Sequence, residues 1–167
     1  ALERAKGAGV PAAVVSKKEC GSQAAFEHRL QGILELDGID MIILAGFMSI
    51  LSENFTKKWP NRILNIHPSL IPAFCGEGFY GLHVHEAALS RGVKVTGATV
   101  HFVNEIADGG PIIIQKAVEV QDDVEVLPED TPETLQRRVM EQAEWILLPQ
   151  AAELVARQIA TSPSNTR

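Results

Sequence analysis

The sequence contains little cysteine and no paired cysteine motif. Its 167 residues include only Cys20 and Cys75, and neither belongs to a Cys-x-x-Cys pair or to a Cys/His spacing typical of zinc sites. This pattern excludes a disulfide-stapled fold and leads us to expect no metal. Two isolated thiols also favour a reducing compartment, so we expect a cytoplasmic protein.

Long apolar runs and an excess of basic residues are also missing. No apolar run approaches the roughly 18–20 residues of a membrane-spanning helix, and no signal peptide is visible, so we expect no membrane partner. The formal net charge is −6 at pH 7, which argues against a nucleic-acid partner because such proteins usually carry a basic face. Small molecules are the expected partners, and we expect a monomer or a homodimer.

The composition is otherwise typical of one globular domain. Hydrophobic residues make up 46% and charged residues 22% of the chain, and a chain of this length can bury a substantial core. We predict a single domain over residues 1–160 and a polar tail over residues 161–167. The sequence opens at Ala1 without Met, in residues that resemble the middle of a helix, and we therefore expect a piece of a longer chain.

Predicted helices alternate with apolar segments in the first half of the chain. We expect helices over residues 1–6, 25–34, 52–59, 83–89 and 133–159, the last bent at Pro149, and strands over residues 10–15, 40–46, 62–67, 93–103 and 111–120. This order predicts an α/β fold, a Rossmann-like three-layer αβα sandwich with a mixed, mainly parallel sheet. Ligands of such sheets bind beyond the carboxyl ends of the strands.

One of these strand ends carries the stretch Asn65-Ile66-His67-Pro68-Ser69-Leu70-Ile71-Pro72. Side chains two residues apart on a strand share a face, so an amide and an imidazole would lie together where Pro68 ends the strand. An amide donor beside a proton-transfer group suits the stabilisation of an oxyanion. The alternative is that Asn65 forms a turn and His67 is an ordinary near-surface residue.

Asp108 lies in a second polar segment, residues 104–110. An aspartate flanked by glycines is often a turn former. In the functional alternative Asp108 contacts His67, where its charge would favour the imidazolium form that can donate a proton near neutral pH. We expect His83 and His101 near this site and His85 on the surface of its helix. Cys75 lacks an evident base partner for nucleophilic catalysis.

Three motifs together resemble the signature of the folate-dependent formyltransferases. They are Asn65-x-His67-Pro-Ser-Leu-Ile-Pro, Gly97-x-Thr99-Val100-His101-Phe102-Val103 and Asp108-Gly109-Gly110-Pro111, and Gly46-Phe47-Met48 and Tyr80-Gly81-Leu82-His83 fit as well. The resemblance covers essentially the whole chain up to the last helix. Within this family, the chain is most similar to the enzymes that formylate glycinamide ribonucleotide.

The resemblance implies transfer of a formyl group from the co-substrate 10-formyltetrahydrofolate to the amine of 5-phosphoribosylglycinamide in de novo purine biosynthesis, without a metal. Asn65 would hydrogen-bond the oxyanion, His67 would stabilise or protonate it, and Asp108 would hold His67. The resemblance also implies folate contacts from Met48, Ser49, Ile50, Leu51, Asn65, Asn104, Asp108 and Gln23, and substrate contacts from His83 and Glu144. From the residues alone, Ile50 and Leu51 could equally be core residues and Glu144 a solvated helix residue.

The sequence also departs from the family pattern. The family's N-terminal strand and its Gly/Ser-rich phosphate loop are missing, so the expected sheet lacks its first strand, and Gln23 stands where many members carry arginine. The rival functions are a formyltetrahydrofolate hydrolase, in which water replaces the amine, and an inactive folate-binding fragment. A methionyl-tRNA formyltransferase would need a further C-terminal domain and positive charge for RNA.

Overall fold

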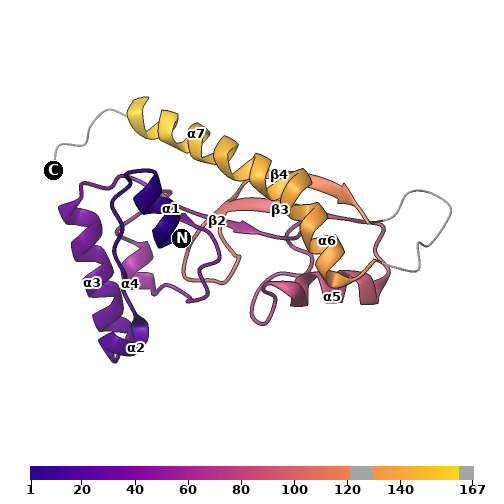
Figure 1. Ribbon diagram of the computed structural model, residues 1–167, viewed down its shortest axis with the longest axis horizontal. Coiled ribbons are helices and arrows are strands. Elements are labelled where there is room, and N and C mark those ends of the chain that lie inside the picture. Colours follow the sequence, from indigo (N-terminus) through magenta and orange to yellow (C-terminus); the bar gives the residue numbers. More distant parts are fainter. Residues whose placement is uncertain (121–129, 162–167) are drawn as a thin grey trace. The chain divides into compact units, whose positions relative to one another are not determined.

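The computed structural model describes residues 1–120 and 130–161, and the chain divides into two compact units (Figure 1). The first unit covers residues 1–39, and the second begins at Asp40. A single domain over residues 1–160 stays a prediction. The predicted tail lies outside the described residues except for Thr161, which ends the last helix.

The first unit is helical. It contains α1 (Leu2–Gly7), α2 (Lys17–Cys20) and α3 (Gln23–Leu36). Ser22 begins α3 because its hydroxyl accepts a hydrogen bond from the Ala25 N–H at 3.1 Å, which satisfies one of the donors that a helix start leaves free. The helix predicted over residues 25–34 is therefore confirmed.

The strand predicted over residues 10–15 is wrong. These residues form no regular element, and Val10 and Val14 remain exposed. The β-branched composition suggested a strand, but a strand is stable only when a neighbouring strand satisfies its backbone groups. Among the described residues, no strand pairs with this segment.

The second unit is a sheet with flanking helices. Its elements in chain order are β1 (Ile42–Leu44), α4 (Glu53–Thr56), β2 (Ile63–His67), α5 (Leu82–Arg91), β3 (Val95–Phe102), β4 (Ile112–Glu119), α6 (Pro132–Val139), the π-helix η1 (Met140–Glu144) and α7 (Trp145–Thr161). The sheet order is β1-β2-β3-β4. The β1–β2 pair is parallel, and the β2–β3 and β3–β4 pairs are antiparallel. The predicted α/β class and mixed sheet are confirmed, although parallel pairing is the minority among these strands.

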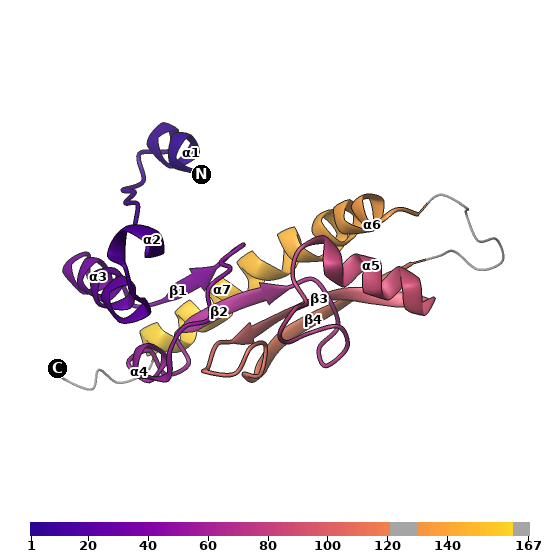
Figure 2. The same ribbon diagram turned by 90° about the horizontal axis from the view of Figure 1, so that it is seen from below.

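The hydrophobic core lies between one face of this sheet and the helices that follow it. Figure 2 shows α7 running along the strands, and it packs against β3 and β4. Strands and helices contribute buried side chains to one cluster, which contains Leu64, Ala88, Ala98, Val100, Val118, Val120, Leu135, Val139, Ala143, Leu147, Ala151 and Val155. The opposite face of β2 and β3 is therefore left for polar side chains.

The last helical stretch is interrupted before the predicted bend. Thr131 caps α6 through a reciprocal pair of hydrogen bonds with Thr134, and the π turn η1 then separates α6 from α7. In this turn the Trp145 N–H reaches back to the carbonyl of Met140. Pro149 lies inside α7, where its ring cannot donate to the carbonyl four residues earlier. The helix is therefore interrupted at residues 140–144, before Pro149, where we predicted a bend. Among the described residues, every helix is too short or too polar to cross a bilayer.

Candidate active site

Two polar side chains project from the same face of β2. Leu64 and Ile66 pack with the helix-covered core, so Asn65 and His67, which alternate with them, point to the opposite face. Asn65 is partly buried and His67 is buried. Pro68 follows the strand at once. The structure therefore places the amide and the imidazole together at a strand end, as the spacing predicts.

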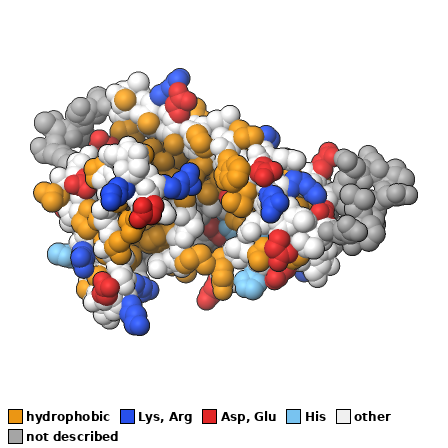
Figure 3. Space-filling view, in the orientation of Figure 1, with side chains coloured by type: hydrophobic (Ala, Val, Ile, Leu, Met, Phe, Trp, Pro, Cys, Tyr) orange, Lys and Arg blue, Asp and Glu red, His pale blue; other side chains and the backbone are white. Residues whose placement is uncertain are grey.

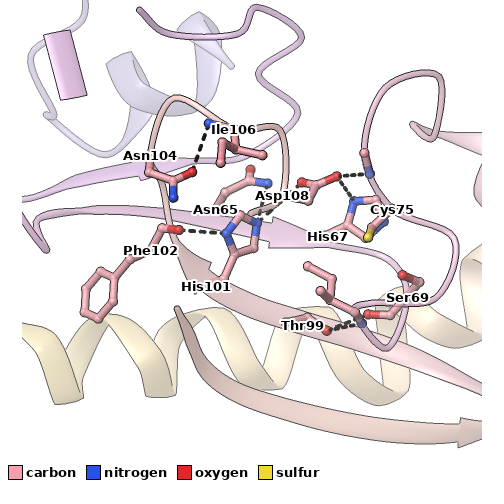
Figure 4. A network of polar contacts seen from close by, with 12 residues as sticks. Asn65, His67, Ser69, Cys75, Thr99, His101, Phe102, Asn104, Ile106 and Asp108 are labelled. Carbon is pink, nitrogen blue, oxygen red and sulfur yellow. Dashed lines mark hydrogen bonds and ion pairs between the residues drawn. The ribbon is translucent and has the colours of Figure 1, made fainter. Parts of the chain in front are cut away.

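His101 faces Asn65 from the neighbouring strand. The two residues are partners in the antiparallel β2–β3 register. The His101 Nδ1–H donates to the carbonyl of Phe102 at 2.8 Å, which leaves Nε2 to accept from the Asn65 Nδ2 group at 3.3 Å (Figure 4). This contact fixes the orientation of the Asn65 amide and leaves its second N–H for a ligand.

His67 lies between two oxygen acceptors. Its Nε2–H donates to the carbonyl of Phe74 at 2.8 Å, and its Nδ1 lies 3.4 Å from Asp108 Oδ2. A neutral imidazole carries one N–H, whereas an imidazolium carries two. Both ring nitrogens of His67 therefore face oxygen atoms, one on the loop after β2 and one on the loop that carries Asp108.

Asp108 is held by three different segments. Its Oδ2 accepts a hydrogen bond from the Gly76 N–H at 2.9 Å, and its Oδ1 lies 3.5 Å from His101 Nε2. Burial alone would raise the pKa of Asp108, but its polar surroundings at His101, the Gly76 hydrogen bond and the neighbouring His67 hold that pKa below its usual value. Asp108 is therefore a charged carboxylate at neutral pH.

The two residues after Asp108 must be glycines because a larger side chain at either position would clash with its neighbours. A Cβ on Gly110 would overlap the carbonyl oxygen of Phe102, the last residue of β3. The Phe102 N–H also donates to the carbonyl of Pro111 at 2.8 Å. The loop that carries Asp108 is thus closed tightly against the end of β3, which sets the height of the carboxylate above the sheet.

A second polar network holds the loop after β2. The Thr99 hydroxyl donates to the carbonyl of Ser69 at 2.6 Å and accepts from the Ile71 N–H at 3.1 Å. The Gln115 side chain donates to the carbonyl of Ile71 at 3.0 Å and to the Thr99 hydroxyl at 2.8 Å. The sheet therefore fixes the loop that carries the Phe74 carbonyl, the acceptor for His67.

A pocket of about 830 Å³ opens at the carboxyl ends of β1 and β2, and its lining includes Asn65, His67, His101 and Asp108. Its walls come from residues 44–51, residues 76–81, the loop before Asp108, and one side of the helical stretch from Gln136 to Pro149. Figure 3 shows an acidic and a histidine side chain deep in a hollow with apolar side chains beside it. A pocket of this size, with apolar walls and a few convergent polar groups, is typical of a small-molecule site.

A family model described as formyl transferase matches residues 1–151. The chain belongs to the formyl transferase family. Over 155 residues it is 46% identical to the trifunctional purine biosynthetic protein adenosine-3 of Gallus gallus, a match that covers 93% of this chain and 14% of that protein. It is 38% identical over 141 residues to the phosphoribosylglycinamide formyltransferase of Haemophilus influenzae, with 84% of this chain and 61% of the relative covered.

Solved structures of this family have the same fold. The crystal structure of glycinamide ribonucleotide transformylase 1 from Symbiobacterium toebii matches with a TM-score of 0.81 and 43% identity, and the match covers 94% of this chain and 68% of that one. The chain thus spans most of the solved structure but only part of the length of the curated relatives.

The segment predicted to contact folate forms one wall of this pocket. Met48 and Ile50 line it and are 66% and 59% exposed, which excludes the alternative interpretation of Ile50 as a core residue. Ser49 and Leu51 also line the pocket, but Leu51 is buried, as its alternative interpretation as a core residue predicts. Asn104 lines the opposite side, where its Oδ1 accepts from the Ile106 N–H at 3.0 Å.

Glu144 also lines the pocket, at the end of the π turn. It is partly buried, and burial raises the pKa of its carboxyl, so it is not the solvated helix residue of the alternative interpretation. Trp145, the next residue, lines the same pocket and is 61% exposed. Both residues lie where the π turn passes into α7, and π turns are frequent at functional sites.

The structure leaves the predicted ligand roles of His83 and Gln23 open, and His83 is not among the residues that line this pocket. His83 is exposed, pairs with Glu86 at 3.0 Å and contacts the ring of Tyr80, which does line the pocket. Gln23 begins α3 in the first unit, where its amide hydrogen-bonds Glu27. Their roles toward substrate and folate stay predictions.

The prediction that His85 lies on the surface is wrong. Its side chain is fully buried on the inner side of α5, beside Val84 and Ala88. Neither ring nitrogen has a hydrogen-bond partner among the described residues. Burial, and then the charge of His67, lower the pKa of His85 to about 4.

The expected place of His101 near the site is confirmed, but sequence reasoning did not predict its contacts with Asn65 and Asp108 or the part that Thr99 plays. Thr99 is fully buried and His101 almost so. A signal was present, because alternation on a strand places Thr99 and His101 on one face, as it does Asn65 and His67. The antiparallel register that brings the two pairs together could not be read from either strand alone.

We expect His85 to make the stability of the chain depend on pH. The pKa of His85 is lower in the folded than in the unfolded state. As the pH falls, the unfolded chain therefore takes up the proton first, which favours unfolding. The stability that is present above about pH 6.5 is therefore lost as the pH falls toward about 4. From pH 7 to pH 5 this loss is about 2 kcal/mol, measurable by urea unfolding at both values.

The His85→Leu variant should lose this part of the pH dependence, whatever its stability at pH 7. His28→Leu replaces an exposed histidine of α3 and should keep the full dependence. If His85→Leu and the unsubstituted chain lost equal stability between pH 7 and pH 5, the buried His85 would not be the cause.

Proposed function

We propose that this chain transfers the formyl group of 10-formyltetrahydrofolate to the amine of 5-phosphoribosylglycinamide. The observation that carries the proposal is the convergence of the Asn65 amide, the His67 imidazole and the Asp108 carboxylate at one pocket. The relatives that bear the name phosphoribosylglycinamide formyltransferase support the choice of substrate. No metal enters the proposal, because the formyl group arrives already activated.

In the proposed reaction the amine nitrogen attacks the formyl carbon and the carbonyl oxygen becomes an oxyanion. Asn65 uses the N–H that His101 leaves free to donate to this oxygen, and one such donor contributes about 3 kcal/mol to the transition state. The folate nitrogen gains a proton from His67 as its bond to the formyl carbon breaks. The proton that the amine nitrogen loses restores the His67 imidazolium, which Asp108 holds, so the transfer consumes no net proton.

The pocket accommodates both ligands in this proposal. Met48, Ile50 and Leu51 offer apolar walls to the pterin ring, while backbone groups of residues 48–51 and Asn104 offer hydrogen bonds. Glu144 accepts hydrogen bonds from hydroxyl groups of the amine substrate. The proposal includes a cytoplasmic location, which the two isolated thiols support, and a monomeric or homodimeric state.

An assay with and without the amine tests this function. The natural full-length protein is incubated with 10-formyltetrahydrofolate, alone and with 5-phosphoribosylglycinamide, and deformylation of the folate is followed spectroscopically. We expect turnover only with the amine, in equal amount to the formylated product. Glycinamide without the phosphoribosyl group is the matched control and should react poorly. Equal turnover without any amine would overturn the transferase in favour of a hydrolase.

A further inference from the structure

Two consecutive residues of the pocket wall carry polar groups that the protein itself does not use. Glu144 and Trp145 both line the pocket, where the π turn η1 passes into α7. Among the residues that the structure describes, neither the Glu144 carboxylate nor the Trp145 indole N–H has a hydrogen-bond partner. A free acceptor and a free donor therefore follow one another along this wall.

The Glu144 carboxylate has lost water without a replacement from the protein. The residue is partly buried, and burial raises the pKa of its carboxyl with no hydrogen bond or positive charge acting against it. A buried polar group is costly unless a partner satisfies it. Because the carboxylate lines the pocket, a ligand that donates hydrogen bonds is the partner that would satisfy it.

Trp145 places a large aromatic surface in the same pocket. Tryptophan is highly buried on average, as Trp59 is at 6% exposure, but Trp145 is 61% exposed. The face of an indole ring carries partial negative charge and attracts the weakly positive hydrogens of C–H groups, while its N–H donates hydrogen bonds. The side chain therefore suits a ligand that offers C–H groups beside an oxygen acceptor.

We propose that Trp145 is a specificity-determining residue for the pentose ring of the amine substrate, with the indole face on C–H groups of the ring and the indole N–H beside Glu144 on its hydroxyl groups. The inference rests on the proposed function. A hydroxyl group both donates and accepts, so a sugar satisfies the free acceptor and the free donor together. The folate is assigned to a separate wall, residues 48–51, which supplies its own apolar side chains.

Steady-state kinetics of the natural full-length protein test this inference. We expect Trp145→Ala to raise KM for 5-phosphoribosylglycinamide about tenfold. Both kcat and KM for 10-formyltetrahydrofolate should stay within about twofold, because an interaction made equally in the ground state and the transition state affects KM alone. Trp145→Phe keeps an aromatic face but lacks the N–H, and its KM should lie between the other two values.

Leu154→Ala is the matched control for loss of an exposed apolar side chain. Leu154 belongs to the same helix and is 48% exposed, but it does not line the pocket. This variant should leave kcat and both KM values unchanged. An unchanged KM for 5-phosphoribosylglycinamide in Trp145→Ala, or an increase confined to the folate, would overturn the inference.

An amine without the sugar separates recognition of the pentose from a general effect on the site. Glycinamide reacts slowly, so its kcat/KM is measured at high concentrations of the amine. Because glycinamide has no pentose for Trp145 to contact, its kcat/KM should be the same in Trp145→Ala and in the unsubstituted protein. An equal loss of kcat/KM with glycinamide and with 5-phosphoribosylglycinamide would show that Trp145 acts on the fold of the site and would overturn the inference.

Tryptophan fluorescence gives a readout that needs no turnover. The chain has two tryptophans, and Trp145 is the exposed one. Titration with ribose 5-phosphate, without folate, should move the emission to shorter wavelength as the indole leaves water, and inorganic phosphate should not. Trp145→Phe should abolish this shift. A shift that inorganic phosphate reproduces, or that persists in Trp145→Phe, would contradict recognition of the pentose by Trp145.

The two readouts keep the inference apart from the proposed function. If the unsubstituted protein transferred no formyl group, the proposed function would fail while the fluorescence titration still decided whether Trp145 binds the pentose. If transfer occurred and Trp145→Ala kept a normal KM for the amine substrate, the function would stand and the inference would fail.

Discussion

Replacement of His67 by alanine is expected to lower kcat by about 10²–10⁴-fold, the range for loss of a general acid. The variant removes the group that lies between the Phe74 carbonyl and Asp108. Without it, the folate nitrogen must leave without a proton donor and the oxyanion loses a neighbouring positive charge. Steady-state kinetics with both substrates saturating measure the effect.

The pH profile adds a second readout for His67. If the imidazolium is the proton donor, the basic limb of the kcat profile should be present in the unsubstituted protein and absent from His67→Ala. His28→Ala, at an exposed position of α3, serves as the histidine control and should keep both the rate and the profile. A His67→Ala variant with a rate within threefold of normal would contradict the proposed role.

Replacement of Asn65 by alanine is expected to lower kcat by about 10²–10³-fold with a smaller change in KM. Its amide is held by His101 on one side, so the remaining N–H is oriented before the oxyanion forms. An interaction made mainly in the transition state affects kcat rather than ground-state binding. Initial rates over a matrix of both substrate concentrations separate the two constants.

Asn104→Ala gives the matched amide comparison for Asn65. Asn104 lines the same pocket, but its Oδ1 is used to accept from the Ile106 N–H, and we assign it to folate binding. It should therefore change KM for the folate more than kcat. If the two asparagine variants altered kcat and KM in the same proportions, Asn65 would be a binding residue rather than the oxyanion donor.

Local patterns were sufficient to predict the parts of the site that lie within one element. Asn65 and His67 follow from strand alternation and from Pro68, and the start of α6 follows from Thr131 before Pro132. The Asp108–His67 contact was one of two alternatives that the residues left open, and the resemblance favoured it, because nothing in the spacing of these residues decides between them. The contact depends on a tight loop that closes against Phe102.

The wrong predictions share a physical cause, which is that long-range packing decided the outcome. The composition of residues 10–15 favours a strand, but β propensity has little effect without a partner strand. His85 follows Val84 and precedes Ala88 by three residues, so it lies at the edge of the buried stripe of α5. A polar residue at such an edge can face either way, and the packing of α5 turned it inward.

The irregular features of the backbone also could not be predicted from the sequence. Nothing local marks the π turn at residues 140–144, which brings Glu144 and Trp145 to the pocket together. The pairing of β3 with β4 shifts between Val100 and His101, and such bulges often lie next to active sites. Both features depend on neighbouring elements that a single segment does not reveal.

The antiparallel register of β2 and β3 separates two kinds of sequence change in this member of the formyl transferase family. Asn65 and His101 are register partners, so a slip of one strand by one residue would turn the side chain of that strand toward the helical core and separate the pair. Residues 76–81 lie between the strands in the chain and form a wall of the pocket without belonging to the sheet. Their length and composition can vary while the register stays the same, provided that the first of them still reaches Asp108. A change in residues 76–81 can therefore reshape the wall of the pocket without moving the polar side chains that β2 and β3 hold.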